Sequence, residues 1–149
     1  DDLVFGDLGD DTAVGGQGFD FVQGNAGDDY VSGDLGNDTV LGGQGSDIVM
    51  GGAGDDYVSG DLGNDTVTGG TGADLFNFAG GDGHDVVTDF SRAAGHHIRI
   101  SPSDAADFTA LSSHITSQGA DTLITLGAQT VLLVGVSAGS LTAADFVFA

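Results

Sequence analysis

Aspartate recurs at a fixed interval over the first half of the chain, in a spacing that could hold rows of metal ions. From Gly6 the sequence divides into nine nine-residue units with aspartate at the sixth position, interrupted only by the insertion of Phe78 and Ala79. If two units complete one coil, each aspartate lies above the equivalent aspartate of the coil before it. The predicted columns, with Asp2 added from a truncated first unit, are Asp2, Asp20, Asp38, Asp56 and Asp74, and Asp11, Asp29, Asp47, Asp65 and Asp85.

Stacked carboxylates at this spacing repel one another unless a cation lies between them. Residues 1–91 contain 19 aspartates and neither lysine nor arginine, so no side chain of this region can neutralise the columns. A divalent cation between each vertical pair would use both carboxylates. Calcium fits better than magnesium, because flexible loops rich in carbonyl oxygens form a cage and not a rigid octahedron. The two columns make eight pairs, so about seven or eight calcium ions are expected.

The composition supports a metal-binding protein built from turns. All 23 acidic residues are aspartate, against two basic residues and 28 glycines, and the net charge is −21. Aspartate and glycine favour turns, and so acidic a surface excludes nucleic acid as a partner. Cysteine is absent, so a hard cation with oxygen ligands is the expected metal. We expect no membrane span, because no apolar run is long enough, and any export signal peptide would lie elsewhere.

The repeat itself predicts the fold. We expect the first six residues of each unit to form a glycine-rich loop and the last three a short strand with an inward apolar residue at the eighth position. Two such units complete one coil, which predicts an all-β fold over residues 1–90: a right-handed parallel β-roll, a two-sheet solenoid with 18 residues per coil. The inward residues are Ala13, Val22, Val31, Val40, Val49, Val58, Val67, Phe76 and Val87.

A different composition begins after Phe90, where both arginines and the only proline lie. We expect residues 91–149 to form a small C-terminal β-rich cap, with a short helix over 104–113, strands over 121–126 and 130–136, and a terminal segment DFVF. A solenoid needs such a cap, because its last coil would otherwise expose an apolar face and an unpaired edge.

The repeats resemble a known family. Their pattern, GGxGxDxUx, is that of the repeats-in-toxin (RTX) calcium-binding nonapeptide family. The segments ADLFNFAGGDGHDVVTDF, HIRIS, DTLITL and DFVF resemble the C-terminal region of serralysin-type proteases and other type I secretion substrates. The resemblance implies a module that is unfolded in low-calcium cytosol and folds outside the cell. It also implies type I secretion machinery of Gram-negative bacteria as a partner, a signal within 91–149, an upstream passenger domain, and a secreted, extracellular or cell-surface location.

Backbone carbonyls at the second and fourth positions are the further ligands assigned with this pattern. They belong to Gly16, Gly18, Asn25, Gly27, Asp34, Gly36, Gly43, Gly45, Gly52, Gly54, Asp61, Gly63, Gly70 and Gly72. Four units replace the second glycine, by Asp7, Asn25, Asp34 and Asp61. Turn geometry explains these residues, since both types tolerate left-handed backbone, and auxiliary calcium ligation is the alternative.

Other functions are weighed against this hypothesis. The alternative is a structural or polysaccharide-binding module of a surface-layer protein, an adhesin or an alginate-modifying enzyme. Aromatic side chains at outward or loop positions could stack on a polysaccharide, although such residues more often pack on the neighbouring coil. They are Phe19, Phe21, Tyr30 and Tyr57.

Catalysis and zinc binding have little support in the sequence. We expect the chain not to be an enzyme, because Ser112, Ser113 and His114 have no nucleophile elbow or oxyanion loop around them. Adjacent His96 and His97 point to opposite faces of a strand and are expected in the cap or on the surface. With Arg99, these two histidines stand where related sequences carry an acidic residue, and the sequence leaves the role of all three open.

Overall fold

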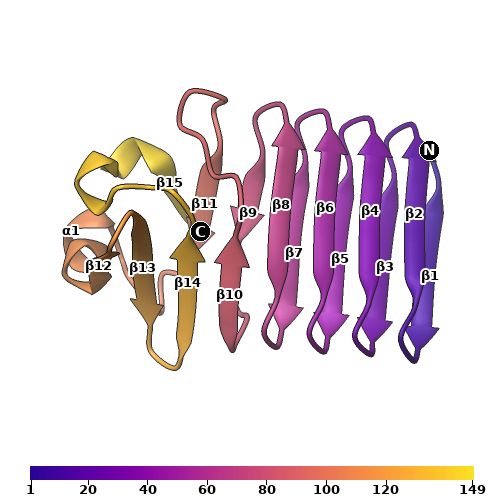
Figure 1. Cartoon of the computed structure of the whole chain (residues 1–149), viewed down its shortest axis with the longest axis horizontal. Helices are drawn as coiled ribbons and strands as arrows, with labels where there is room; N and C mark the ends of the chain where they lie inside the picture. Colours follow the sequence, from indigo (N-terminus) through magenta and orange to yellow (C-terminus); the bar gives the residue numbers. More distant parts are fainter.

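Each nonapeptide forms one strand and one tight turn. The computed structural model describes residues 1–149, and the repeats supply eight strands of equal length. These strands are β1 (Leu3–Leu8), β2 (Thr12–Gln17), β3 (Phe21–Ala26), β4 (Tyr30–Leu35), β5 (Thr39–Gln44), β6 (Ile48–Ala53), β7 (Tyr57–Leu62) and β8 (Thr66–Thr71). They alternate between two facing sheets, so successive coils stack along the long axis of the molecule (Figure 1).

The strands are longer than the sequence predicts. Each contains the last three residues of one unit and the first three of the next, so only the fourth to sixth positions form the turn. The prediction of a six-residue loop is therefore wrong. The loop is shorter because the glycines and polar residues of the first three positions pair with the neighbouring coil as part of the strand, as Asn25 does with Gly43.

The predicted coil of 18 residues is confirmed by the register. All repeat strands pair in parallel with the strand two further along the chain. From β1 to β7 each residue faces the one 18 positions later, as Val22 faces Val40 and Val31 faces Val49, and the two-residue insertion makes the offset 20 between β8 and β10. Odd-numbered strands form one sheet and even-numbered strands the other. The two-sheet parallel β-roll predicted from the spacing is thus the observed fold.

The core is a single layer of side chains between the sheets. All nine predicted eighth-position residues are buried, and Val22 to Val67 at this position are fully enclosed. Burying one valine stabilises the fold by roughly 1.5–3 kcal/mol, whereas fixing the backbone of each residue costs about 1–2 kcal/mol. One large apolar side chain per nine residues is therefore a small core for a chain of this length.

The C-terminal residues continue both sheets. The 7-stranded sheet ends in β9 (Leu75–Asn77), β11 (His97–Ile100) and β15 (Phe146–Phe148), all parallel. The 8-stranded sheet passes from β8 to β10 (His84–Val87) and β14 (Gln129–Leu133), then to antiparallel β13 (Asp121–Leu126) and β12 (Ile115–Gln118). The buried apolar residues form one cluster that runs from Ala13 to Phe146. The boundary at residue 90 remains a prediction, and the sheets and core cross it without a break.

Local predictions for the cap were correct in part. The strand over 121–126 is confirmed as β13, whereas the predicted strand over 130–136 is β14 and ends earlier, at Leu133. The predicted helix is only α1 (Phe108–Leu111), followed by the 3₁₀ helix η1 (Ser112–His114). Asp107 sets the start by accepting the N–H of Ala110, so residues 104–106 stay outside the helix.

Two further 3₁₀ helices, η2 (Ala138–Ser140) and η3 (Ala143–Asp145), lead to the last strand. No helix in the structure has the length and apolar character needed to cross a membrane.

Candidate metal sites

The structure brings the sixth-position aspartates into the two predicted columns. In every coil, the backbone N–H of one of these residues donates to Oδ1 of the aspartate one coil further on, as Asp38 does to Asp56 at 2.8 Å. The same bond recurs through both columns and also joins Asp65 to Asp85 at 3.2 Å. The insertion of Phe78 and Ala79 therefore leaves Asp85 in its column. From Asp20 in one column and Asp29 in the other, one oxygen of each carboxylate is fixed, which orients the other oxygen.

The second oxygen of these carboxylates is buried without a partner. From Asp20 onward, every column aspartate is at least nine-tenths buried. In eight of the column aspartates, Oδ2 is buried and has no hydrogen-bond partner. These eight are Asp11, Asp20, Asp29, Asp38, Asp47, Asp56, Asp65 and Asp74. A buried carboxylate oxygen with no donor is costly, and here eight of them recur in register.

Burial changes the protonation of these groups when no cation is present. Desolvation raises the pKa of Asp47, Asp56, Asp65 and Asp85 to about 6, although backbone N–H donors partly oppose it. Neighbouring column aspartates add a repulsive contribution in the same direction. Desolvation also raises the pKa of Asp38. The metal-free fold therefore resists the charged form of its own columns.

The first-position glycines make room for these carboxylates. A Cβ added to Gly51 would lie 2.6 Å from Oδ2 of Asp56 and 2.5 Å from the carbonyl oxygen of Gly69 in the next coil. Its backbone is not in the left-handed region, so the close approach and not the backbone angle requires glycine. A carboxylate oxygen and a backbone carbonyl oxygen thus converge on one small space at each first-position glycine from Gly6 to Gly51.

The fourth-position carbonyls are a second set of free oxygens. Each points along the column, and a Cβ added to the glycine above it would lie only 1.4–2.1 Å away. From Gly18 to Gly72, none of these carbonyls accepts a hydrogen bond. At the second position, the carbonyls of Asn25, Asp34 and Gly52 point toward the next coil in the same way. The fourth-position carbonyls from Gly18 to Gly63, and these three at the second position, thus point from one coil toward the next.

These oxygens fit calcium. No three aspartate or histidine side chains converge at one point, so a cation here would take its remaining ligands from the backbone. Each turn offers Oδ2 of a fixed aspartate and unpaired carbonyl oxygens, which are hard ligands in a flexible loop. The predicted assignment of individual ligands and the number of ions remain predictions.

Second-position residues have the backbone geometry expected of turn formers. Asp7, Asn25, Asp34 and Asp61 have φ between 69° and 77°, in the left-handed region. In two of them the side chain accepts a hydroxyl hydrogen bond on the outer face, from Ser32 to Asp34 and from Ser59 to Asp61. Their carboxylates therefore have partners that the columns lack, which supports the structural role.

The fifth position carries a ladder that the sequence analysis missed. In five of the nine units the side chain is an exposed Asp or Asn that accepts a backbone N–H from the next coil, as Asp55 does from Ala73 at 2.8 Å and Asn37 does from Asp55 at 3.0 Å. The other four units have Phe19, Ser46, Ala73 and His84 at this position, whereas the sixth position is always aspartate. That difference is the signal in the sequence that separates a hydrogen-bonding role from a charged one.

Three of the four aromatic candidates contact another side chain, and none of the four is fully buried. Phe21 lies 5.8 Å from Phe5 between ring centres, Tyr30 contacts Met50 through its hydroxyl, and Phe19 is exposed. Tyr57 contacts Arg99.

Both arginines have partners. Arg99 also donates to Asn77, and Arg92 donates to Asp145, Ser140 and Thr142. Burial opposes ionisation of Asp145, but the N–H of Thr142 and the Arg92 guanidinium hold its pKa below the usual value. Both guanidinium groups therefore make contacts within the protein.

Comparisons with known proteins agree with the repeat pattern. The family model for the RTX calcium-binding nonapeptide repeat (4 copies) matches residues 1–40 and 41–76, which is more than half of the chain. No curated protein matches the sequence.

Two solved structures resemble the chain. The extracellular lipase LipA from Serratia marcescens is 20% identical with a TM-score of 0.48, over 95% of this chain and 38% of the lipase. The AlgE6R3 subunit of the Azotobacter vinelandii mannuronan C5-epimerase is 28% identical with a TM-score of 0.48, over 97% of this chain and 80% of the subunit. The chain thus spans well under half the length of the lipase.

Replacing Asp56 by asparagine should weaken calcium binding far more than the same change at Asp55. Both substitutions remove one charge and both retain Oδ1 as a hydrogen-bond acceptor, for the N–H of Asp38 at Asp56 and of Ala73 at Asp55, but only Asp56 has a buried, unpartnered Oδ2. We expect D56N to raise the calcium concentration at the folding midpoint about tenfold, or ~1.4 kcal/mol, and D55N less than about twofold. Circular dichroism during calcium titration measures both, and equal shifts would mean that the columns act only by diffuse charge.

Metal-free protein should form the roll more readily in acid. The raised pKa values near 6 mean that the folded columns take up protons at a pH where the unfolded aspartates, with pKa values near 3.8, are ionised. This contribution to stability is fully present below the unfolded pKa and is lost as the pH rises through about 6. Calcium-free protein should show more β signal at about pH 5 than at about pH 8, and the opposite order would contradict the burial of the columns.

Proposed function

This chain belongs to the family of RTX calcium-binding nonapeptide repeats, and from that premise we propose that it is a calcium-dependent folding module of a larger exported protein. Its repeats stay unfolded where calcium is scarce and form the roll where calcium is abundant. The role is non-catalytic. The passenger domain, upstream in the same polypeptide, would supply the activity of the whole protein.

The buried, unpartnered Oδ2 atoms carry this proposal. Eight aspartates each bury a carboxylate oxygen, and these carboxylates stack in register from coil to coil. The repeat region has no lysine or arginine to neutralise their charge. The thin valine layer adds little stability per residue, so the compact state depends on what neutralises the columns. A cation that binds only the folded array adds its binding free energy to the folding free energy.

The calcium dependence of folding would allow the chain to be exported in its unfolded state. Extracellular calcium modules have dissociation constants of roughly 0.1–1 mM. The free calcium concentration of cytosol is far below this range, so the array would remain unfolded before secretion. An unfolded chain can pass through the narrow channel of type I secretion machinery, and calcium outside a Gram-negative cell would then fold it. Folding there would also oppose backward movement. Residues 91–149 would carry the uncleaved signal, and the mature location is extracellular or at the cell surface.

The cap is expected to order together with the roll. Its strands β11 and β14 pair with β9 and β10 of the repeats, and its apolar residues belong to the same core cluster. Without folded repeats, these strands lose their neighbours on one side. The cap is therefore part of the same calcium-dependent unit.

Circular dichroism in chelator should show a coil-like chain, and millimolar calcium should produce a cooperative β signal. Cooperativity is expected because each coil supplies ligands to the site shared with the next. Magnesium at the same concentration, and sodium chloride at the same ionic strength, are the controls and should not reproduce the transition. A chelated sample that already shows the full β spectrum at neutral pH would leave the roll as a static scaffold.

A further inference from the structure

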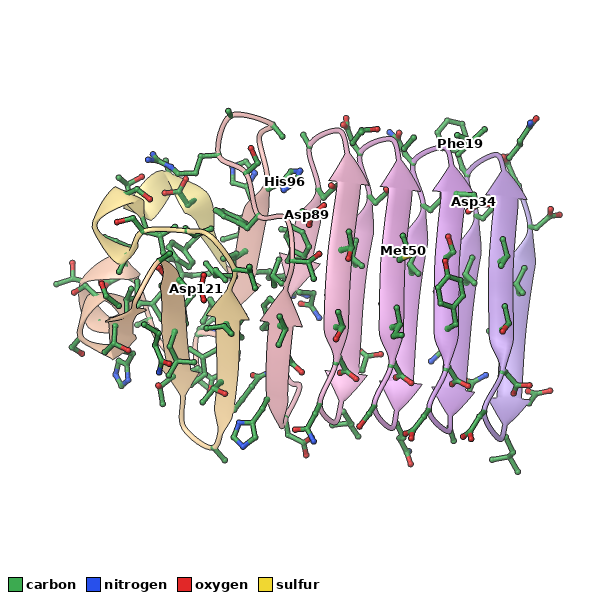
Figure 2. All side chains as sticks on the ribbon, viewed as in Figure 1. Phe19, Asp34, Met50, Asp89, His96 and Asp121 are labelled. Carbon is green, nitrogen blue, oxygen red and sulfur yellow. The ribbon has the colours of Figure 1, made fainter.

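The first aspartate column ends at a histidine. Strand β11 pairs with β9 so that His97 faces Leu75 and Ile98 faces Phe76, which puts His96 in register with Asp74. His96 therefore occupies the place that the next sixth-position aspartate would have. Figure 2 labels it where the repeat strands meet the C-terminal segment.

The imidazole of His96 is buried and oriented. Its ring packs edge-on against Phe76 and Phe90, and 2% of the residue is exposed. Nδ1 accepts the backbone N–H of Ser91 at 3.1 Å, so the hydrogen of the neutral ring lies on Nε2. Nε2 lies 3.2 Å from Oδ2 of Asp74, and neither atom makes a hydrogen bond in the structure. The Nε2 side of the ring thus lies against the last carboxylate of the column.

The second column ends in a chemically similar way. Nε2 of Gln129, a buried side chain of β14, donates to Oδ2 of Asp85 at 3.1 Å. The backbone N–H of Thr130 donates to the carbonyl of Gly83, the fourth-position oxygen of that last turn. Both kinds of oxygen that are free in the other turns are therefore occupied by N–H donors here.

We propose that His96 is a neutral terminator of the first calcium row: its Nε2–H takes the place that a calcium ion would hold beyond Asp74. Gln129 has the same role at the end of the second row, where its side-chain N–H donates to Asp85. The number of ions in a row is then set by which residue stands at the sixth position of the coil that follows. This inference rests on the proposed calcium rows and adds where they stop.

The interrupted ladder supports this role. Through the first column each aspartate N–H donates to the next carboxylate, but the N–H of Asp74 has no carboxylate ahead of it. An aspartate at residue 96 would supply that acceptor and would place a second carboxylate against Oδ2 of Asp74. Two facing carboxylates in a buried site need a cation between them, as elsewhere in the column.

Counting bound calcium in His96→Asp tests the proposal. Native mass spectrometry of the full chain in saturating calcium should find one more ion in H96D than in the parent protein. The matched control is His97→Asp, the same change at the adjacent exposed residue, which should bind the parental number of ions. His96→Asn retains an N–H donor at the junction and should also leave the count unchanged.

Three results would overturn the proposal while leaving the proposed function intact. One is a folded H96D that binds the parental number of ions, and another is an H96D whose cap stays disordered in saturating calcium while H96N folds. A gain of one ion in H97D as well would attribute the effect to net charge and would also overturn it. Failure of the parent protein to fold in calcium would instead refute the proposed function.

Discussion

From Asp11 to Asp74, each turn of the roll buries a carboxylate oxygen, Oδ2, that has no hydrogen-bond partner, and these carboxylates stack on one another from coil to coil. In most folds, buried charges are paired with a cationic side chain or avoided. Here the repeat region contains no lysine or arginine, so the columns can be neutralised only by protons or by an external cation. This constraint links the local geometry of every repeat to the conditions in which the whole array is stable.

The other positions of the repeat serve that carboxylate. The first-position glycine leaves room for Oδ2, because a Cβ on Gly51 would collide with Asp56 and with a neighbouring carbonyl. The fourth-position glycine directs its own carbonyl along the column and brings successive turns close together. The eighth-position valines hold the two sheets at a distance that keeps the turns in register. The same four positions therefore determine stability, ion binding and the spacing of the coils, and these are the positions that vary least from one nonapeptide to the next.

Much of this arrangement could be predicted from the sequence because a strict period fixes register. The two columns, the inward valines and the 18-residue coil follow from spacing alone, and the structure contains all three. Strand length could not be predicted in the same way, since glycine and asparagine at the first three positions have low strand propensity and pair only because a coil lies on each side. The partners at the column ends were also missed. Gln129 meets Asp85 across 44 residues, and His96 is recognisable as a sixth-position residue only once β11 is seen to pair with β9.

The central claim is that cations lie in two lines inside the roll, between the aspartates of successive coils. The most direct measurement is anomalous diffraction from crystals of the protein grown in calcium, or with a lanthanide in its place. The account predicts about seven or eight peaks in two rows, each within about 2.4 Å of a sixth-position carboxylate oxygen and of backbone carbonyl oxygens from the adjoining turns. Folded protein with peaks only on the outer faces of the sheets, or with three or fewer peaks along the columns, would contradict it.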